Sequence, residues 1–407
     1  VGLHYIGEVH NKWSAARKLF DLISDCQLQW SKMDDNYDRI IFPDRTFNYV
    51  APREQFIDDM INYFPKEEKA IHTYVQYLDE AVRSARPYFA NKALPGMLAN
   101  ITYPFMTGKF FKYANRTTFD VISSLSDNPK LMGVLTGQWG DYGLPPKKSS
   151  FAMHAFVARH YLDGGNYPVG SSRRIAETVA DLIESRGGRL VVNAGVKKIV
   201  VHKEKAIGVE LENGDVLEAP IIISNAGVVN TFDRLLKNES ASSSPLADLE
   251  TIDQTESYVC LHLGLNKSAK ELKLNSTNLW VYPGYNHDRN VQEFMQDSKN
   301  DFPVVYISFP STKDDEWDKE HAGFATIEAI TLAHWDEYSK WQDLPWKKRG
   351  EVYEKEKEKL SQRILDIVYQ HVHQAKDALA YAELSTPLTV TSLANYSKGE
   401  MYGISHT

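Results

Sequence analysis

GGNYPVGSSRRIAETVADLIESRGGRLVVNAGVKKIVVHKEKAIGVELENGDVLEAPIIISNAG, at residues 164–227, is the stretch that decides the fold. Its first half has apolar residues at the spacing of one helix face, and Gly187-Gly188 follow, which predicts a helix over 171–187 with a glycine C-cap. The run 221–223 is Ile-Ile-Ile without alternation, so it predicts a strand buried on both faces. Asn213-Gly214 predicts a hairpin turn within a group of short strands, expected at 190–193, 196–202, 206–211 and 216–219.

Small residues follow the expected buried strand. Asn225, Ala226 and Gly227 come directly after it, at the carboxyl end, where open α/β sheets bind their ligands. Gly164-Gly165 precede the helix and form a second group of small residues. Both groups are candidates for ligand contact, and the alternative is that the glycines serve turn geometry alone.

This order of helix, small meander, return strand and small-residue turn resembles the middle of flavoproteins with two dinucleotide-binding halves. The finer pattern resembles the phytoene desaturase and all-trans-retinol 13,14-saturase family, and is closest to the retinol saturase branch. The matching pieces keep the family's order along nearly the whole chain: GLHYIG at 2–7, residues 153–161, Gly164-Gly165, Tyr167-Pro168, Asn225-Ala226-Gly227, Phe309-Pro310-Ser311, Trp317, TPLT at 386–389 and Tyr402-Gly403.

The resemblance implies an α/β, two-domain flavoprotein. An FAD-binding domain like those of glutathione reductase and amine oxidases is expected from residues 1–10, 150–235 and 385–407. A mixed α+β substrate-binding domain with a helical lid is expected from 11–149 and 236–384. No GxGxxG unit and no C-terminal flavin motif match the family, so we expect an internal fragment with an incomplete FAD domain. Such a fragment is expected to bind FAD poorly.

The implied activity is that of an FAD-dependent oxidoreductase that saturates or desaturates carbon–carbon double bonds of an isoprenoid, retinoid or carotenoid polyene. Residues expected to contact the flavin are Gly164, Gly165, Tyr167, Gly170, Val196, Asn225, Ala226 and Gly227. Ser171 stands where the family pattern has a second glycine. Four residues are candidates for the proton donor, and the sequence does not choose among them: His4, Tyr5, His154 and Tyr167.

Several alternatives stay open at this point. NAD(P)H is compatible as an electron source, but no residue pattern identifies it. A flavin amine-oxidase-like enzyme would share the scaffold, and an aromatic cage facing the flavin, in place of a long apolar tunnel, would favour it. A non-catalytic lipid-binding protein that kept the cavity is the third reading.

Composition excludes other classes. The chain has 407 residues and a net charge of -8 without a basic stripe, which argues against nucleic-acid binding. Cys26 and Cys260 form no metal-binding motif, and His371 and His373 are two apart on an expected helix and do not share a face. The sequence therefore predicts no metal site.

Residues 93–116 are rich in aromatic residues, flanked by lysines and interrupted by Pro95 and Pro104. They predict either a buried helical lid or a peripheral membrane contact, in which Phe105, Phe110 and Phe111 would face the lipid. No run is long and apolar enough to span a bilayer, so the expected location is peripheral to a membrane, on its cytoplasmic side. The rest of the chain predicts a linker at 240–245 and a separate antiparallel sheet of alternating strands at 258–265, 279–283, 304–309 and 324–332.

Overall fold

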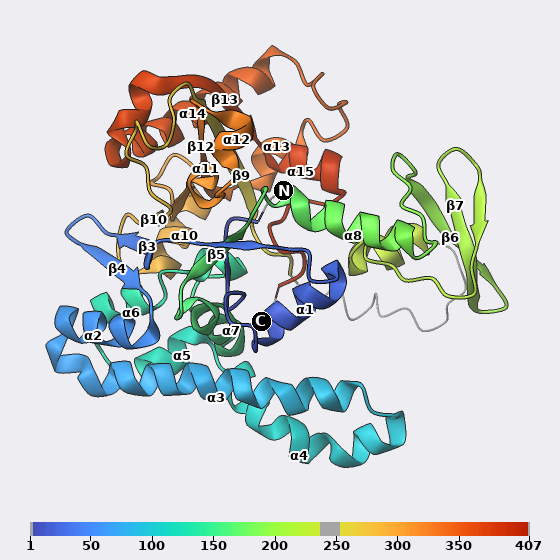
Figure 1. Ribbon diagram of the computed structural model, residues 1–407, viewed down its shortest axis with the longest axis horizontal. Helices are drawn as coiled ribbons and strands as arrows, with labels where there is room; N and C mark the ends of the chain where they lie inside the picture. The colour runs from blue at the N-terminus through green and yellow to red at the C-terminus, as the bar shows by residue number, and fades with distance from the viewer. Residues whose placement is uncertain (1–2, 237–252, 406–407) are drawn as a thin grey trace.

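The structure is a computed structural model that describes residues 3–236 and 253–405 (Figure 1). The predicted linker at 240–245 lies outside the described residues. The described strands form three sheets, of seven, three and three strands. Helices α2 to α7 lie below the seven-stranded sheet in Figure 1, and one of the small sheets extends to the right. The chain has the expected mixed α/β architecture.

The seven-stranded sheet has the order β13-β9-β12-β11-β10-β3-β4, and its neighbours are antiparallel except for β10 and β3. The four alternating strands predicted in the second half of the chain are confirmed as β9 to β12. Alternation fits the observed sheet because one face packs into the core while the other lines cavities. The strands are β3 (Asn36–Ile41), β4 (Thr46–Val50), β9 (Ser257–Leu265), β10 (Asn278–Val281), β11 (Val305–Ser308), β12 (Ala325–Ala333) and β13 (Leu379–Ser385).

The helical layer is built around α3 (Glu68–Lys92), which buries Ile71, Tyr74, Val75 and Leu78 on one face. Its partner α4 (Gly96–Ala114) begins after Pro95, as predicted, but continues through Pro104. The prediction that Pro104 interrupts the segment is therefore wrong, because a proline removes one hydrogen-bond donor without necessarily ending a helix. The other helices of this layer are α2 (Arg53–Tyr63), α5 (Thr118–Ser123), α6 (Pro129–Leu135) and α7 (Phe151–Tyr161).

Helices also cover the other parts of the chain. The longest of these is α14 (Glu351–His371). Among the described residues, no helix combines the length and the apolar character that crossing a membrane requires. The remaining helices are α1 (Ala15–Ser24), α8 (Arg173–Ser185), α10 (His287–Gln296), α11 (Pro310–Lys313), α12 (Trp317–His321), α13 (Trp335–Ser339) and α15 (Pro387–Ala394), with short turns of helix at Pro65–Glu67, Trp139–Tyr142, Asn230–Leu235 and His373–Ala378.

A small sheet joins the start of the chain to the central stretch. Its order is β1 (Ile6–Gly7), β5 (Gly165–Pro168) and β2 (Trp30–Lys32). Gly7 pairs with Gly165, and a Cβ atom at Gly7 would lie 1.8 Å from the carbonyl oxygen of His160. Close approach of two backbones therefore requires glycine at this position.

The third sheet confirms most of the predicted meander. Helix α8 is followed by β6 (Val196–His202), β7 (Lys205–Leu211) and β8 (Val216–Glu218). Gly187 and Gly214 have φ of 81° and 92°, the left-handed conformation that the predicted C-cap and hairpin need. These elements form the projection on the right of Figure 1.

The strands predicted at 190–193 and 221–223 are wrong. Neither segment forms a strand, and Ile221 and Ile223 are 76% and 89% exposed. A strand buried on both faces needs paired neighbours. No strand of the described residues pairs with either segment, so their apolar side chains face solvent.

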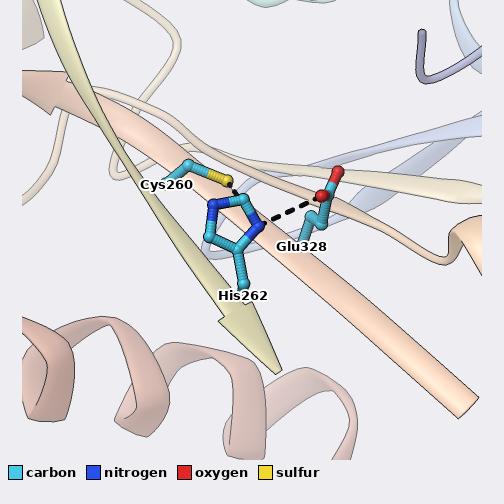
Figure 2. A group of neighbouring side chains, drawn as sticks. All are labelled: Cys260, His262 and Glu328. Atoms are coloured by element: carbon cyan, nitrogen blue, oxygen red, sulfur yellow. Dashed lines mark hydrogen bonds and ion pairs between the residues drawn. The ribbon is translucent and has the colours of Figure 1, made fainter. Parts of the chain in front are cut away.

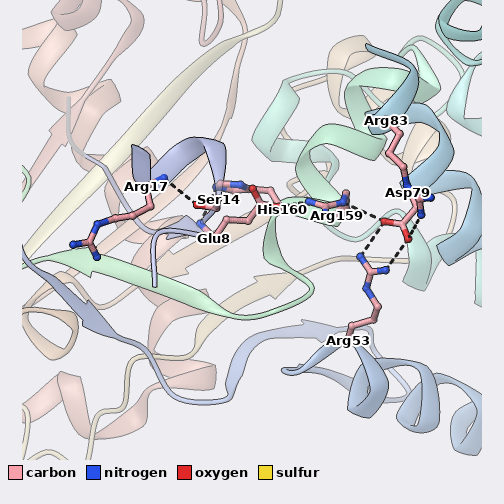
Figure 3. A network of polar contacts seen from close by, with 9 residues as sticks. Glu8, Ser14, Arg17, Arg53, Asp79, Arg83, Arg159 and His160 are labelled. Atoms are coloured by element: carbon pink, nitrogen blue, oxygen red, sulfur yellow. Dashed lines mark hydrogen bonds and ion pairs between the residues drawn. The ribbon is translucent and has the colours of Figure 1, made fainter. Parts of the chain in front are cut away.

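A network of charged side chains connects the N-terminal segment to α7, α3 and α2 (Figure 3). Asp79 accepts two hydrogen bonds from Arg53, at 2.7 and 3.0 Å, and one from Arg159 at 3.2 Å. Arg159 also pairs with Glu8. Burial of Asp79 opposes its ionisation, but the hydrogen bonds and charges of Arg53 and Arg159 lower its pKa overall. The network thus holds the N-terminal segment on the helical layer.

Candidate active site

Two adjoining cavities lie on one face of the seven-stranded sheet. The smaller has a volume of about 170 Å³ and the larger about 320 Å³, and His4, Tyr258 and Ile330 line both. In the sheet, Cys260 and Tyr306 are both paired with Ile330. Because side chains alternate between the faces of a sheet, every second residue of β9 and β12 points to the same side. The pairing of β9, β11 and β12 therefore places side chains of these strands in the walls of both cavities.

The smaller cavity is lined mainly by aromatic and aliphatic side chains. Tyr258, Trp280, Tyr306 and Tyr402 contribute aromatic surface, and the ring centroids of Trp280 and Tyr306 lie 4.5 Å apart. Asp141 is the one carboxyl group among the lining residues. A cavity of this kind can bind an apolar ligand and place it next to the carboxyl group, which can donate a proton.

The Asp141 carboxyl belongs to a buried hydrogen-bonded group. Tyr5 Oη lies 2.9 Å from Asp38 Oδ2 and 3.2 Å from Asp141 Oδ2. Asp38 also accepts hydrogen bonds from Gln138 Nε2 at 2.8 Å and from Asn278 Nδ2 at 2.9 Å. Asp38 therefore has two amide donors of its own, whereas among the described side chains Asp141 contacts only the Tyr5 hydroxyl, whose single hydrogen it shares with Asp38.

This difference separates the pKa values of the two carboxyl groups. Burial, helped by the charge of Asp38, raises the pKa of Asp141 to about 8. Burial also raises the pKa of Asp38, but the hydrogen bonds from Asn278, Gln138 and Tyr5 limit it to about 6. At neutral pH Asp38 is mostly ionised and Asp141 keeps its proton. Tyr5, whose pKa burial raises well above its usual value, also stays protonated.

Lys313 lies beneath this group. Its Nζ donates to Asn278 Oδ1 at 2.6 Å, to Ser308 Oγ at 2.7 Å and to the backbone oxygen of His4 at 2.9 Å. Burial lowers the pKa of Lys313 to about 7, because the charged ammonium is removed from water. Its hydrogen bond to the His4 carbonyl fixes the backbone that carries His4 between the two cavities.

The larger cavity contains Cys260, His262 and Glu328, which come together on two paired strands (Figure 2). His262 Nδ1 lies 3.1 Å from Glu328 Oε1 and 3.8 Å from Cys260 Sγ. His262 Nε2 lies 3.1 Å from Ser385 Oγ of β13. His4 Nδ1 lies 3.3 Å from the other Glu328 oxygen. Two histidines thus share one carboxylate.

Burial sets the ionisation of this cluster. It lowers the pKa of His4 to about 4 and raises that of the Cys260 thiol well above its usual value. Burial opposes ionisation of Glu328, but the hydrogen bond with His262 and the charges of His4 and Lys313 lower its pKa overall. At neutral pH Glu328 is therefore the anionic member.

Six of the residues predicted from sequence are brought close together. Pairing of β1 with β5 places His4 and Tyr5 beside Gly165 and Tyr167. Gly164 directly precedes β5 and Gly170 follows it. Gly170 N donates to Asp314 Oδ1 at 2.9 Å. Tyr167 is buried, and burial raises its pKa.

The turn after β5 also shows what the serine at position 171 does. Gly170 has φ of 81° and Ser171 has φ of 71°, so both adopt the left-handed conformation. That conformation favours glycine and strains other residues. Ser171 therefore occupies a position whose left-handed backbone suits the glycine of the family pattern.

The other predicted residues lie elsewhere. Val196 begins β6, and Asn225, Ala226 and Gly227 lie in an exposed segment that Asn230 connects to α15. His154 is in the hydrophobic core, where its two ring nitrogens lie 2.8 Å from Tyr74 Oη and 3.0 Å from Tyr142 Oη. Neither described cavity includes His154. It is a satisfied core histidine and a poor candidate for the proton donor.

Added Cβ atoms test what the glycines serve. At Gly165 a Cβ would lie 2.7 Å from Met33 Sδ, so a larger residue there would have to displace Met33. At Gly170 it would approach no atom closer than 3.7 Å, and at Gly227 it would meet none within 4 Å. Gly170 and Gly227 have φ of 81° and 87°, so turn geometry by itself accounts for glycine at both positions.

Sequence reasoning missed the residues that give the cavities their chemistry. Cys260 and His262 alternate with apolar residues on a predicted strand, and pairing 258–265 with 324–332 would have placed Glu328 opposite them. Asp141 and Lys313 carried no such signal, because their roles depend on burial between distant segments.

Comparison with known proteins shows which proteins this chain is similar to in sequence. All-trans-retinol 13,14-reductase of Danio rerio is 31% identical, over 100% of this chain and 70% of that protein. Prolycopene isomerase 2, chloroplastic, of an Oncidium hybrid cultivar is 23% identical, over 83% of this chain and 55% of that protein.

No protein-family model matches the chain. Among solved structures, an oxidoreductase from Methanosarcina mazei superposes with a TM-score of 0.56 at 11% identity, covering 94% of this chain and 75% of that chain. This likeness shows a shared fold. The match to the Danio rerio protein, 31% identical over the whole of this chain, shows that the chain belongs to the all-trans-retinol 13,14-reductase family.

Proposed function

We propose that this protein is an FAD-dependent oxidoreductase that saturates a carbon–carbon double bond of a retinoid or carotenoid polyene. The relatives named for all-trans-retinol and prolycopene support the substrate class. The observation that carries the proposal is the pair of adjoining cavities, of about 170 and 320 Å³, with the protonated Asp141 in the wall of the smaller one. A polyene has almost no polar handle, so its affinity comes from burial of apolar area at about 25 cal/mol per Å².

The residues proposed to hold FAD are Gly164, Gly165, Tyr167, Gly170, Val196 and the segment Asn225, Ala226 and Gly227. The match of these residues to the family pattern supports this assignment. When bound, FAD supplies hydride-transfer chemistry, which no amino-acid side chain provides. The division into an FAD domain and a substrate domain stays a prediction.

The chain's own groups would supply the proton and the dry surroundings. We assign proton donation to Asp141, whose carboxyl lines the cavity and keeps its proton at neutral pH. After transfer, Tyr5 Oη can stabilise the Asp141 carboxylate by shifting its hydrogen bond from Asp38. Trp280 and Tyr306 exclude water from the same cavity.

A peripheral membrane contact is the second part of the proposal. Helix α4 lies at the lower edge of the molecule in Figure 1. It exposes Met97, Ile101 and Phe105 by 79%, 62% and 86%, and Lys109 lies on the same helix. Phe110, which the sequence placed at the lipid, is instead buried at 8% and stacks on Tyr88. Exposed apolar side chains beside lysines suit an interfacial helix, and they support entry of an apolar substrate from a membrane.

A second candidate reaction is amine oxidation. The aromatic side chains Tyr258, Trp280, Tyr306 and Tyr402 around one cavity favour it, because an aromatic cage can hold an amine. The proposed reaction and this alternative differ in substrate and in the direction of electron flow.

Product analysis tests the function. The protein is incubated with FAD, reduced anaerobically and mixed with all-trans-retinol, and a parallel oxidised sample is mixed with a panel of primary amines. We expect a retinoid that has gained a pair of hydrogens, and no amine product. Oxidation of an amine with no change in the retinoid would assign the alternative reaction.

A further inference from the structure

We propose that Cys260, His262 and Glu328 form a binding site for a divalent transition-metal ion of the zinc class. Figure 2 shows the three side chains together on β9 and β12. They line the cavity of about 320 Å³. The site is independent of the proposed reaction, because it rests on the ligand atoms alone.

The spacing of the ligand atoms matches a tetrahedral ion. One ligand atom each from Cys260, His262 and Glu328 lie within 4.8 Å of one another. Bonds of about 2.0 Å to nitrogen and oxygen and about 2.3 Å to sulfur place neighbouring ligand atoms roughly 3.3–3.5 Å apart in a tetrahedron. The observed distances from His262 Nδ1 are 3.1 Å to Glu328 Oε1 and 3.8 Å to Cys260 Sγ. Small side-chain rotations would bring the three atoms around one ion.

His4 lies beside this group of three but is not one of its ligands. Its Nδ1 atom is shielded from solvent, makes no hydrogen bond with any described residue and lies 3.3 Å from Glu328 Oε2. The ligand atoms within 4.8 Å of one another belong to Cys260, His262 and Glu328 alone. An ion held by these three residues therefore keeps its fourth position for water or a ligand from the cavity.

Ser385 stabilises the ligating form of His262. Its hydroxyl lies 3.1 Å from His262 Nε2 and can either donate or accept a hydrogen bond. Without a metal, the proton on Nδ1 is shared with the ionised Glu328. When a metal binds Nδ1, the neutral imidazole changes tautomer: its single proton leaves Nδ1 and Nε2 becomes protonated. The Nε2–H group then donates to Ser385, as the second ring nitrogen of a metal-bound histidine commonly does.

The donor atoms select the kind of ion. One thiolate, one imidazole and one carboxylate suit Zn²⁺ or Co²⁺ rather than Ca²⁺ or Mg²⁺, which prefer oxygen ligands. Burial raises the pKa of the Cys260 thiol in the metal-free protein, and a bound cation reverses that effect. The ion would lie at one end of the joined cavities.

Cobalt provides a direct probe of the ligands. Purified protein, stripped with a chelator, is titrated with Co²⁺ and its spectrum recorded. We expect about one equivalent to produce tetrahedral d–d bands and a sulfur-to-cobalt charge-transfer band. In C260S the charge-transfer band should be lost. In H262N the affinity for Co²⁺ should fall at least tenfold, as measured from either band. Excess Zn²⁺ should displace the cobalt.

Two control variants distinguish binding at this site from nonspecific binding of Co²⁺ to other cysteine or histidine side chains. Cys26 is the chain's other cysteine and is exposed, and His72 lies on the exposed side of α3. C26S and H72N should bind Co²⁺ like the unchanged protein. Thermal unfolding checks that all variants fold, and Zn²⁺ should raise the melting temperature of the unchanged protein but not that of H262N. An unaltered charge-transfer band in C260S, or its loss in C26S, would overturn the proposal.

Discussion

The chemistry proposed for the cavity depends on one residue, Asp141. Its pKa of about 8 means that it is protonated at neutral pH and loses its proton as the pH rises through 8. Turnover should therefore be highest below pH 8 and fall above it. In D141N the carboxamide keeps the shape but cannot release a proton, so turnover should fall by about 10²–10⁴-fold.

Two measurements check this prediction. Retinoid binding by D141N, followed by quenching of tryptophan fluorescence, should remain within a few-fold of the unchanged protein. Asp35 is exposed and forms a surface ion pair with Lys32, so D35N should leave turnover and its pH profile unaltered. A D141N protein with normal turnover and the same loss above pH 8 would exclude Asp141 as the donor.

Ser171 gives a residue-scale prediction about stability. Its φ of 71° costs about 1–2 kcal/mol for a residue with a Cβ atom. Glycine removes that strain but loses about 0.5–1 kcal/mol through the greater freedom of the unfolded chain. We therefore expect S171G to raise the free energy of unfolding by about 0.5–1 kcal/mol. The neighbouring Ser172 has φ of -62°, so S172G should lower it. The same sign for both variants in denaturant unfolding would contradict the strain argument.

At the scale of elements, Asp79 joins α2, α3 and α7. D79N should lower the free energy of unfolding by about 1–3 kcal/mol, a range reduced for partial exposure of the pair. The folded-state pKa of Asp79 is lowered, so its contribution is full above the ordinary carboxyl pKa and is lost as the pH falls through the lowered value. The difference between the two proteins should therefore shrink in acid. D58N, at an exposed position of α2, is the control and should change stability by less than about 0.5 kcal/mol.

The exposed face of α4 predicts membrane binding. Replacing Ile101 and Phe105 with Asp should weaken binding to liposomes that contain anionic lipid, and slow turnover of membrane-delivered retinol. Turnover of a short, soluble analogue should change little. Leu22 and Val352 are 74% and 64% exposed on other helices, so the L22D/V352D protein serves as the control. Equal loss of liposome binding in both double variants would show that α4 has no special role.

Sequence patterns predicted a helix or strand correctly where the spacing of apolar residues within the segment shows which of its faces is buried. The alternation in β9 and β12 and the helix face of α8 are such local signals, and these elements were found. The run Ile221–Ile222–Ile223 was misread, because its burial depends on strands that no local pattern supplies. Phe110 was misplaced for the same reason, since stacking on Tyr88 decides its burial.

The whole molecule brings distant parts of the chain to one sheet face. His4 from the N-terminus, Asp141 from the helical layer and Glu328 from β12 are joined there only by tertiary packing. The family pattern named His4 and Tyr5 as candidates, and both lie at the cavities or beside Asp141. The acid itself could not be predicted, because burial rather than any motif sets its pKa.

The central claim is that a polyene double bond is saturated in the cavity beside Asp141. The most direct test is turnover of all-trans-retinol in D₂O by the FAD-loaded, anaerobically reduced protein, with mass analysis of the product. The account predicts a saturated product that carries two deuterium atoms on carbon, because the N5–H of the reduced flavin and the proton of the acid both exchange with D₂O. It also predicts little product from D141N. Recovery of unchanged retinol from the reduced, flavin-containing protein would contradict it.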